Sequence, residues 1–67
     1  MAKANSYNQQ RYQQGQRVVI AAFDDLPEHI FQIHEVYEDC VGGYSITGPL
    51  RGEYGEPSFD LILRIAD

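Results

Sequence analysis

Residues 26–41 constrain the fold of this chain more than any other stretch, because their apolar pattern fits two different structures. As a helix, the stretch would begin with Asp25 as its capping residue and end before Gly42, with apolar side chains recurring at helical spacing. As a strand, it is supported by composition, since residues 29–37 are nearly all strand-favouring types and include no alanine, leucine or lysine. Composition favours the strand, and a helix over 26–40 stays open as the alternative.

Three further segments have the pattern of strands. Residues 16–23 form a short apolar run dense in β-branched side chains. Residues 41–47 follow the central segment as the returning arm of a hairpin, and residues 59–65 are apolar at every odd-numbered position. Residues 48–58 hold three glycines and two prolines, which predicts a loop before the last strand.

Alternation along a strand predicts which side chains share a face. In the central strand, Phe31, Ile33 and Tyr37 share one face, and Glu35 is the one misfit among them. In the last strand, the apolar side chains at the odd-numbered positions of 59–65 share one face. These two sets are therefore expected to face the core.

Four strands joined by short turns and one longer loop predict an all-β fold, namely a small antiparallel barrel of four to five strands. The Gly-x-Arg-Val entry at residues 15–18, the long first excursion, the central hairpin and the terminal strand resemble SH3-like barrels in outline. This resemblance covers residues 15–66, and it implies a fold without a function. With a helix over 26–40, the chain would instead be an α+β protein of order β-α-β-β.

Residues 1–14 are rich in Asn and Gln without hydrophobic periodicity, which predicts a disordered polar tail before one folded domain at 15–67. A domain of that size buries only roughly 60% of its unfolded surface, so its stability should be marginal. Cys40 is the only cysteine, and an intrachain disulfide therefore cannot supplement the core. Self-association into a homo-oligomer is the supplement that this leaves.

The chain carries ten acidic and five basic side chains, and their distribution is uneven. All ten acids lie within residues 18–67, so the domain is acidic and should repel nucleic-acid backbones. Basic residues before position 18 allow one alternative, a nucleic-acid accessory protein that contacts phosphates through its tail. The lone cysteine and the absence of a long apolar run lead us to expect a cytoplasmic protein without membrane contact.

Few side chains could support catalysis or bind a metal. His29 and His34 are five residues apart, which suits neither one face of a strand nor the spacing of zinc-binding helices. Cys40 follows the acidic Asp39, and a neighbouring carboxylate makes a thiol less reactive. The glycine pattern matches neither the phosphate-binding nor the dinucleotide-binding motif. We therefore expect no enzyme activity, no metal and no cofactor.

Exposed aromatic side chains are the better candidates for function. Tyr54 lies among glycines and glutamates in a loop too polar to be buried, and tyrosines are common anchors of protein interfaces. Arg51 and Glu53 flank it, and Tyr37 and Tyr44 lie on or beside the predicted central hairpin. These five are the predicted binding residues of a non-catalytic interaction or regulatory module, whose partner is another protein or a second copy of the chain.

Overall fold

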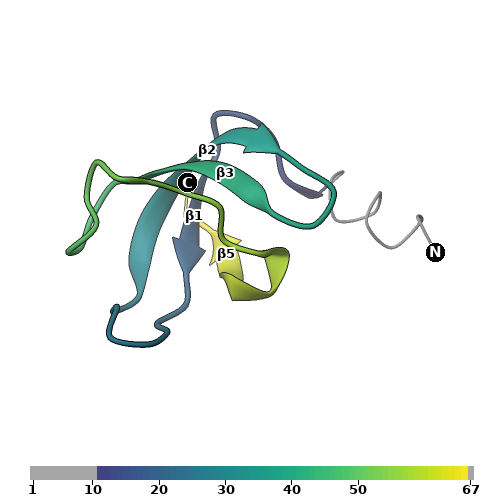
Figure 1. Cartoon of the computed structure of the whole chain (residues 1–67). Helices are drawn as coiled ribbons and strands as arrows, with labels where there is room; N and C mark the ends of the chain where they lie inside the picture. The colour runs from purple at the N-terminus through teal and green to yellow at the C-terminus, as the bar shows by residue number, and fades with distance from the viewer. Residues whose placement is uncertain (1–10, 67) are drawn as a thin grey trace.

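A computed structural model describes residues 11–66, whose strands form one antiparallel sheet (Figure 1). Its five strands follow the order β4-β3-β2-β1-β5, so the first and last strands of the chain are neighbours. The elements are β1 (Arg17–Ile20), β2 (His29–Val36), β3 (Val41–Ser45), β4 (Tyr54–Gly55), the 3-10 helix η1 (Phe59–Leu61) and β5 (Ile62–Ile65). The predicted all-β fold is confirmed. Within residues 11–66 no strand pairing joins β4 to β5, so closure into a barrel is not seen.

The decisive central segment is a strand, and the helix over 26–40 does not form. β2 is paired along both of its edges, with β1 on one side and β3 on the other. Phe31 shows why the strand is favoured, because it lies opposite Val18 of β1 and Ser45 of β3 at the centre of the sheet. Such a position suits an aromatic or β-branched side chain, and β2 is rich in both types.

A β-bulge at His34 interrupts the pairing of β2 with β3. Ile33 lies opposite Gly43 and Glu35 lies opposite Gly42, which leaves His34 without a partner of its own in the ladder. One extra residue on one strand reverses the facing of every residue that follows it. The bulge therefore explains why Glu35 is a misfit in the alternating pattern.

The bulge also changes which side chain enters the core. Phe31 points inward and is 2% exposed, whereas beyond the bulge the inward position belongs to Val36, which packs against the core. Tyr37 is 38% exposed. The expectation that Tyr37 shares the buried face of Phe31 is therefore wrong, and this displacement makes its ring available at the surface.

The last predicted strand begins later than expected. The amide of Leu61 donates to the carbonyl of Ser58 at 3.0 Å, closing the turn of η1, and β5 starts only at Ile62. This turn resets the alternation, so that Ile62 is the buried residue of β5 while Leu63 is 50% exposed. The predicted burial of the odd-numbered positions is therefore wrong within β5.

The predicted loop at 48–58 contains one short strand, β4, which pairs with β3 through two residues. Gly48 and Gly52 precede it with φ values of 86° and 85°, a conformation that side chains with a Cβ rarely adopt. The carbonyl of Glu53 accepts a hydrogen bond from the amide of Ser45 at 3.2 Å, which holds the loop onto β3. This ordered loop fixes the position of Tyr54.

The core lies on the inner face of the sheet. Its buried side chains are Val18, Ile20, Phe31, Ile33, Val41 and Ile62. Partly buried residues pack around them, and they include Tyr12, whose ring stacks on that of Phe59 with centroids 5.7 Å apart. Residues 1–10, which make up most of the predicted tail, lie outside the described residues.

Candidate functional site

A row of residues crosses four strands on the outer face of the sheet. Arg17 of β1 lies opposite Gln32 of β2, Gln32 lies opposite Tyr44 of β3, and Tyr44 lies opposite Tyr54 of β4. Residues paired directly across antiparallel strands project from the same face. Since Val18 and Phe31 point into the core, this row projects outward.

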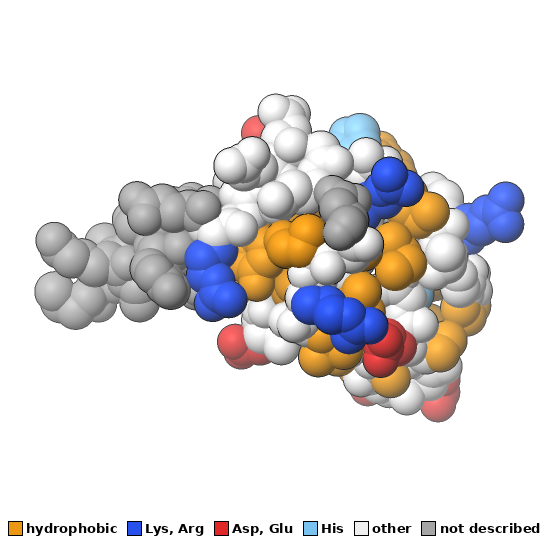
Figure 2. Space-filling view, turned by 180° about the vertical axis from the view of Figure 1, so that it is seen from behind, with side chains coloured by type: hydrophobic (Ala, Val, Ile, Leu, Met, Phe, Trp, Pro, Cys, Tyr) orange, Lys and Arg blue, Asp and Glu red, His pale blue; other side chains and the backbone are white. Residues whose placement is uncertain are grey.

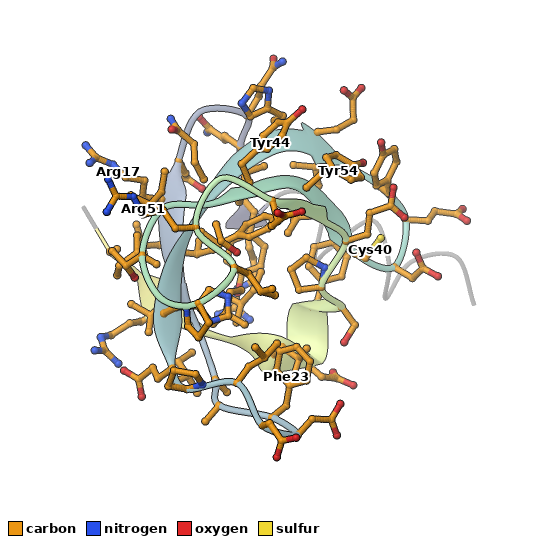
Figure 3. The ribbon with its side chains drawn as sticks, turned by 60° about the vertical axis from the view of Figure 1, so that its left-hand side comes forward. Arg17, Phe23, Cys40, Tyr44, Arg51 and Tyr54 are labelled. Carbon is orange, nitrogen blue, oxygen red and sulfur yellow. The ribbon has the colours of Figure 1, made fainter. Side chains whose placement is uncertain are left out.

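Four aromatic side chains form a continuous surface around this row. The rings of Tyr44 and Tyr54 meet edge to face with centroids 5.5 Å apart, and His34 meets Tyr44 in the same way at 5.0 Å. The hydroxyl of Tyr37 lies within hydrogen-bonding reach of the hydroxyl of Tyr54. We call His34, Tyr37, Tyr44 and Tyr54 the aromatic face. Tyr44 and Tyr54 are the middle two of these contacting side chains, and Figure 3 shows them next to each other.

The aromatic face rests on a glycine. A Cβ at Gly42 would lie 2.7 Å from the hydroxyl oxygen of Tyr54 and 2.9 Å from a ring carbon of Tyr37, so any side chain at this position would displace both rings. Gly42 is buried although it lies on the outer side of β3. The two tyrosines therefore use the space that a side chain would otherwise occupy.

A carboxylate fixes the orientation of Tyr54. Its hydroxyl donates a hydrogen bond to Oε2 of Glu56 at 2.7 Å. Hydrogen bonding to Tyr37 and then to Glu56 raises the pKa of Tyr54 above its ordinary 10.0, because both bonds favour the protonated phenol. A raised folded-state pKa stabilises the fold below pH 10, and that contribution is lost as the pH rises through the folded-state value. Tyr54 is therefore a neutral hydrogen-bonded phenol at neutral pH.

Carboxylates border the end of the aromatic face that holds Tyr37 and Tyr54. Glu56 contacts Tyr54 directly, and Glu35 lies opposite Gly42 and so shares its outer face. Asp39 lies in the turn that follows Tyr37. The chain is acidic as a whole, with a net charge of -5, and the carboxylates of Asp39 and Glu56 are both close enough to Cys40 to act on its thiol.

Two of the described arginines, Arg17 and Arg51, lie away from this end. In Figure 3, Arg17 and Arg51 both lie on the side of the view opposite Tyr54 and Cys40. Arg11 and Arg64 line a shallow depression beside β5, and Figure 2 shows basic side chains among apolar ones on the face seen from behind. The Tyr37 and Tyr54 end of the aromatic face therefore offers aromatic rings and negative charge.

Three of the five predicted binding residues lie together in the aromatic face, namely Tyr37, Tyr44 and Tyr54. Arg51 instead pairs through its backbone with Ser45, and Figure 3 shows its side chain away from Tyr54. The backbone carbonyl of Glu53 accepts a hydrogen bond from Ser45, and no hydrogen bond among residues 11–66 joins the exposed side chain of Glu53 to Tyr54. Sequence reasoning did not propose His34 or Glu56 as part of a site. No sequence pattern marked Glu56, because residues 48–58 were predicted as a loop and β4 ends at Gly55.

The histidines have separate environments. His29 is 8% exposed, and its Nδ1 lies 2.9 Å from the carbonyl oxygen of Pro27, whereas His34 is exposed against Tyr44. Within residues 11–66 no group of three His, Cys, Asp or Glu side chains could hold a metal ion. The same range contains no helix that is long and apolar enough to cross a membrane.

Cys40 lies beside the acidic border and is partly buried. Burial, a hydrogen bond to Asp39, and the negative charges of Asp39 and Glu56 all raise the pKa of this thiol above 9.0. The thiolate is the reactive form of cysteine, so a raised pKa leaves Cys40 protonated at neutral pH. Its surroundings are the reverse of those that activate a catalytic thiol.

Comparison with known proteins identifies no relative, since no protein-family model, no curated protein and no solved structure matches the chain significantly. The geometry of the aromatic face is therefore what supports a function.

Proposed function

We propose that this chain is a non-catalytic protein-binding module, whose aromatic face binds a segment of another protein that carries an arginine or lysine. The observation that supports this most directly is the continuous contact among four exposed aromatic side chains from the β2 to β4 part of the sheet. Tyr44 and Tyr54 are 41% and 52% exposed, although their mutual ring contact and the hydrogen bond from Tyr54 to Glu56 hold them in place. Rigid, exposed tyrosines are favoured interface anchors because they bury a large area at little cost in entropy.

The chemistry of the face favours a cationic partner. A guanidinium or ammonium group is attracted to the face of an aromatic ring, at about 0.5–1 kcal/mol when exposed and more when desolvated. Glu56 is hydrogen-bonded to Tyr54, so a cation placed over that ring would also meet a carboxylate. An acidic partner would meet the same carboxylate as a like charge.

The same charge argument disfavours a second copy of the chain. In a two-fold dimer the aromatic face would pack against itself, which would bring the two Glu56 carboxylates and their acidic neighbours together.

The nucleic-acid alternative depends on the tail, of which the structure describes only residues 11–14. Within that part, Arg11 lies over the ring of Tyr12, with its Cζ 5.8 Å from the centroid. Phosphate contact through the tail stays a prediction.

Peptide titration tests this proposal, because a short peptide can present the cationic group by itself. We expect a short peptide of glycine and arginine to shift the NMR resonances of Tyr44, Tyr54 and Gly42 at roughly millimolar concentration, as suits one or two cation–π contacts. A peptide with glutamate in place of arginine should leave these resonances unchanged. Shifts that are equal for both peptides, or that occur only outside the aromatic face, would reject a cationic partner.

A glycine variant distinguishes the shape of the face from its composition. Gly42→Ala keeps every tyrosine but forces Tyr37 and Tyr54 apart, so we expect binding of the arginine peptide to weaken by about fivefold, the loss of one exposed cation–π contact. The matched control is Gly55→Ala, because a Cβ there lies 3.9 Å from its nearest neighbour, a ring carbon of Phe31, and touches neither tyrosine. Equal affinity of the two variants would contradict a role for the ring arrangement.

A further inference from the structure

A separate cavity lies on the inner side of the sheet, between β2, the loop after β3 and η1. Its volume is about 280 Å³, which is close to the lower end of the range for small-molecule sites. Most of its wall is apolar, formed by Ile20, Phe23, Phe31, Leu50 and Leu61. Gly55 also lines it, and inward-facing Gly55 alternates along β4 with outward-facing Tyr54, so the cavity and the aromatic face are on opposite sides of this strand.

Two buried polar side chains also line the cavity, His29 at 8% exposure and Ser45 at 6%. They are the only buried polar side chains among residues 11–66. The hydroxyl of Ser45 makes no hydrogen bond within that range, yet no described side-chain nitrogen or oxygen is both fully enclosed and unpaired. The hydroxyl is therefore not sealed within the protein, and its residue lines the cavity.

His29 presents an acceptor. Its Nδ1 lies 2.9 Å from the carbonyl oxygen of Pro27, and a carbonyl can only accept, so Nδ1 carries the ring hydrogen. In the neutral ring Nε2 is then a hydrogen-bond acceptor. Within residues 11–66 this nitrogen has no partner, and like the Ser45 hydroxyl it is not fully enclosed. An apolar cavity with one free acceptor and one free hydroxyl is a built site for a ligand that complements both.

We propose that this cavity binds a small, neutral molecule with an apolar ring or branched body and one hydroxyl group. A hydroxyl can donate to Nε2 of His29 and accept from Ser45, whereas a hydrocarbon would leave both groups unpaired. Within residues 11–66 the wall is mostly apolar and includes no lysine or arginine, so a carboxylate or phosphate would lose its hydration there without gaining a cationic partner. The volume suits a single ring with few substituents.

Phenol is the probe that tests this site, with toluene and benzoate as comparisons. We expect phenol to shift the amide resonances of Ile20, Ser45 and Gly55 with a dissociation constant that is roughly millimolar, as is typical of a ligand with so few atoms. Toluene should bind more weakly by about fivefold because it lacks the hydroxyl. Benzoate should cause no shift at these residues. Equal binding of phenol and toluene would overturn the assigned polar contact.

Two variants in the cavity and one control on the outer face localise the binding. Ser45→Ala should weaken phenol binding by about fivefold and leave toluene unaffected, since one hydrogen bond is lost. Gly55→Val places a branched side chain toward Phe31 and should abolish binding of both probes. Tyr44→Ala, on the outer face, should leave both affinities unchanged. Phenol binding that survives Gly55→Val, or an absence of shifts in the parent protein up to saturating phenol, would overturn the proposal. So would shifts at these residues caused only by the arginine peptide, because the cavity would then belong to the protein interface.

Discussion

Replacing Gly43 by alanine should remove most of the stability of the domain, about 3 kcal/mol, because there is no space for a methyl group. A Cβ at this position would overlap the backbone carbonyl oxygen of Gln32 and would lie 3.1 Å from the backbone nitrogen of His34. Both atoms belong to the paired backbone of β2 next to the bulge, so they cannot move aside as a flexible side chain would. Relief therefore requires separation of β2 from β3.

The matched control is the residue directly opposite, since Gly43 pairs with Gly55. Gly55→Ala adds the same methyl group to the same ladder, but its nearest neighbour is a ring carbon of Phe31 at 3.9 Å, so its stability should stay within about 1 kcal/mol of the parent. Urea unfolding followed by circular dichroism measures both variants. Equal stability of Gly43→Ala and the parent would mean that the bulge and its close backbone contact are absent in solution.

Phe31→Ala should destabilise the domain by about 3–5 kcal/mol, the usual cost of removing a buried phenylalanine. Phe31 is 2% exposed, lies between Val18 and Ser45 in the sheet, and is the largest of the fully buried side chains. Its removal leaves a void that a small core cannot fill by moving other side chains. A domain with stability near the usual lower limit of about 5 kcal/mol would be partly unfolded.

Two other substitutions make this loss measurable even if the alanine variant does not fold. Phe31→Leu keeps most of the apolar volume and should cost about 1–2 kcal/mol. Leu63→Ala removes a side chain that is 50% exposed on β5 and should cost less than about 1 kcal/mol. The denaturant midpoint should therefore be lowest for Phe31→Ala, intermediate for Phe31→Leu and highest for Leu63→Ala. A Phe31→Leu midpoint equal to that of the parent would place Phe31 outside the core.

The strands that sequence reasoning identified are those whose pattern is local. Residues 29–37 favour a strand by composition, and β2 spans nearly that range, because β-branched and aromatic side chains fit the two-sided pairing of a central strand. The returning arm at 41–47 likewise contains β3. Both predictions depended on residues within a few positions of one another.

What sequence reasoning missed depends on contacts between distant segments. The bulge at His34 arises where β2 crosses Gly42 and Gly43 of β3, and no pattern within β2 alone marks it. The turn of η1 shifted the phase of β5, because an alternating apolar pattern does not distinguish a strand from a turn followed by a strand. These two shifts decide which apolar side chains are buried.

The sequence predicted that exposed tyrosines form the site, but it predicted only some of the residues that the site contains. Tyr54 was predicted to be exposed because its loop is rich in glycine and glutamate, and it is 52% exposed. Its contact with Tyr44 depends on the register between β3 and β4, which the sequence does not reveal. Arg51 was included because it is near Tyr54 in sequence, and proximity along a turning loop did not bring its side chain to the tyrosine.

Photo-crosslinking in cells that express the chain naturally tests most directly whether the aromatic face binds a protein. The photoreactive residue p-benzoylphenylalanine would replace Tyr44, which is 41% exposed, in one sample and Leu63 of β5, which is 50% exposed, in the other. We expect a protein adduct from position 44, weakened by Gly42→Ala and carrying its crosslink beside an arginine or lysine of the partner. An adduct from position 63 with none from position 44 would contradict the assignment of the aromatic face as the interaction surface.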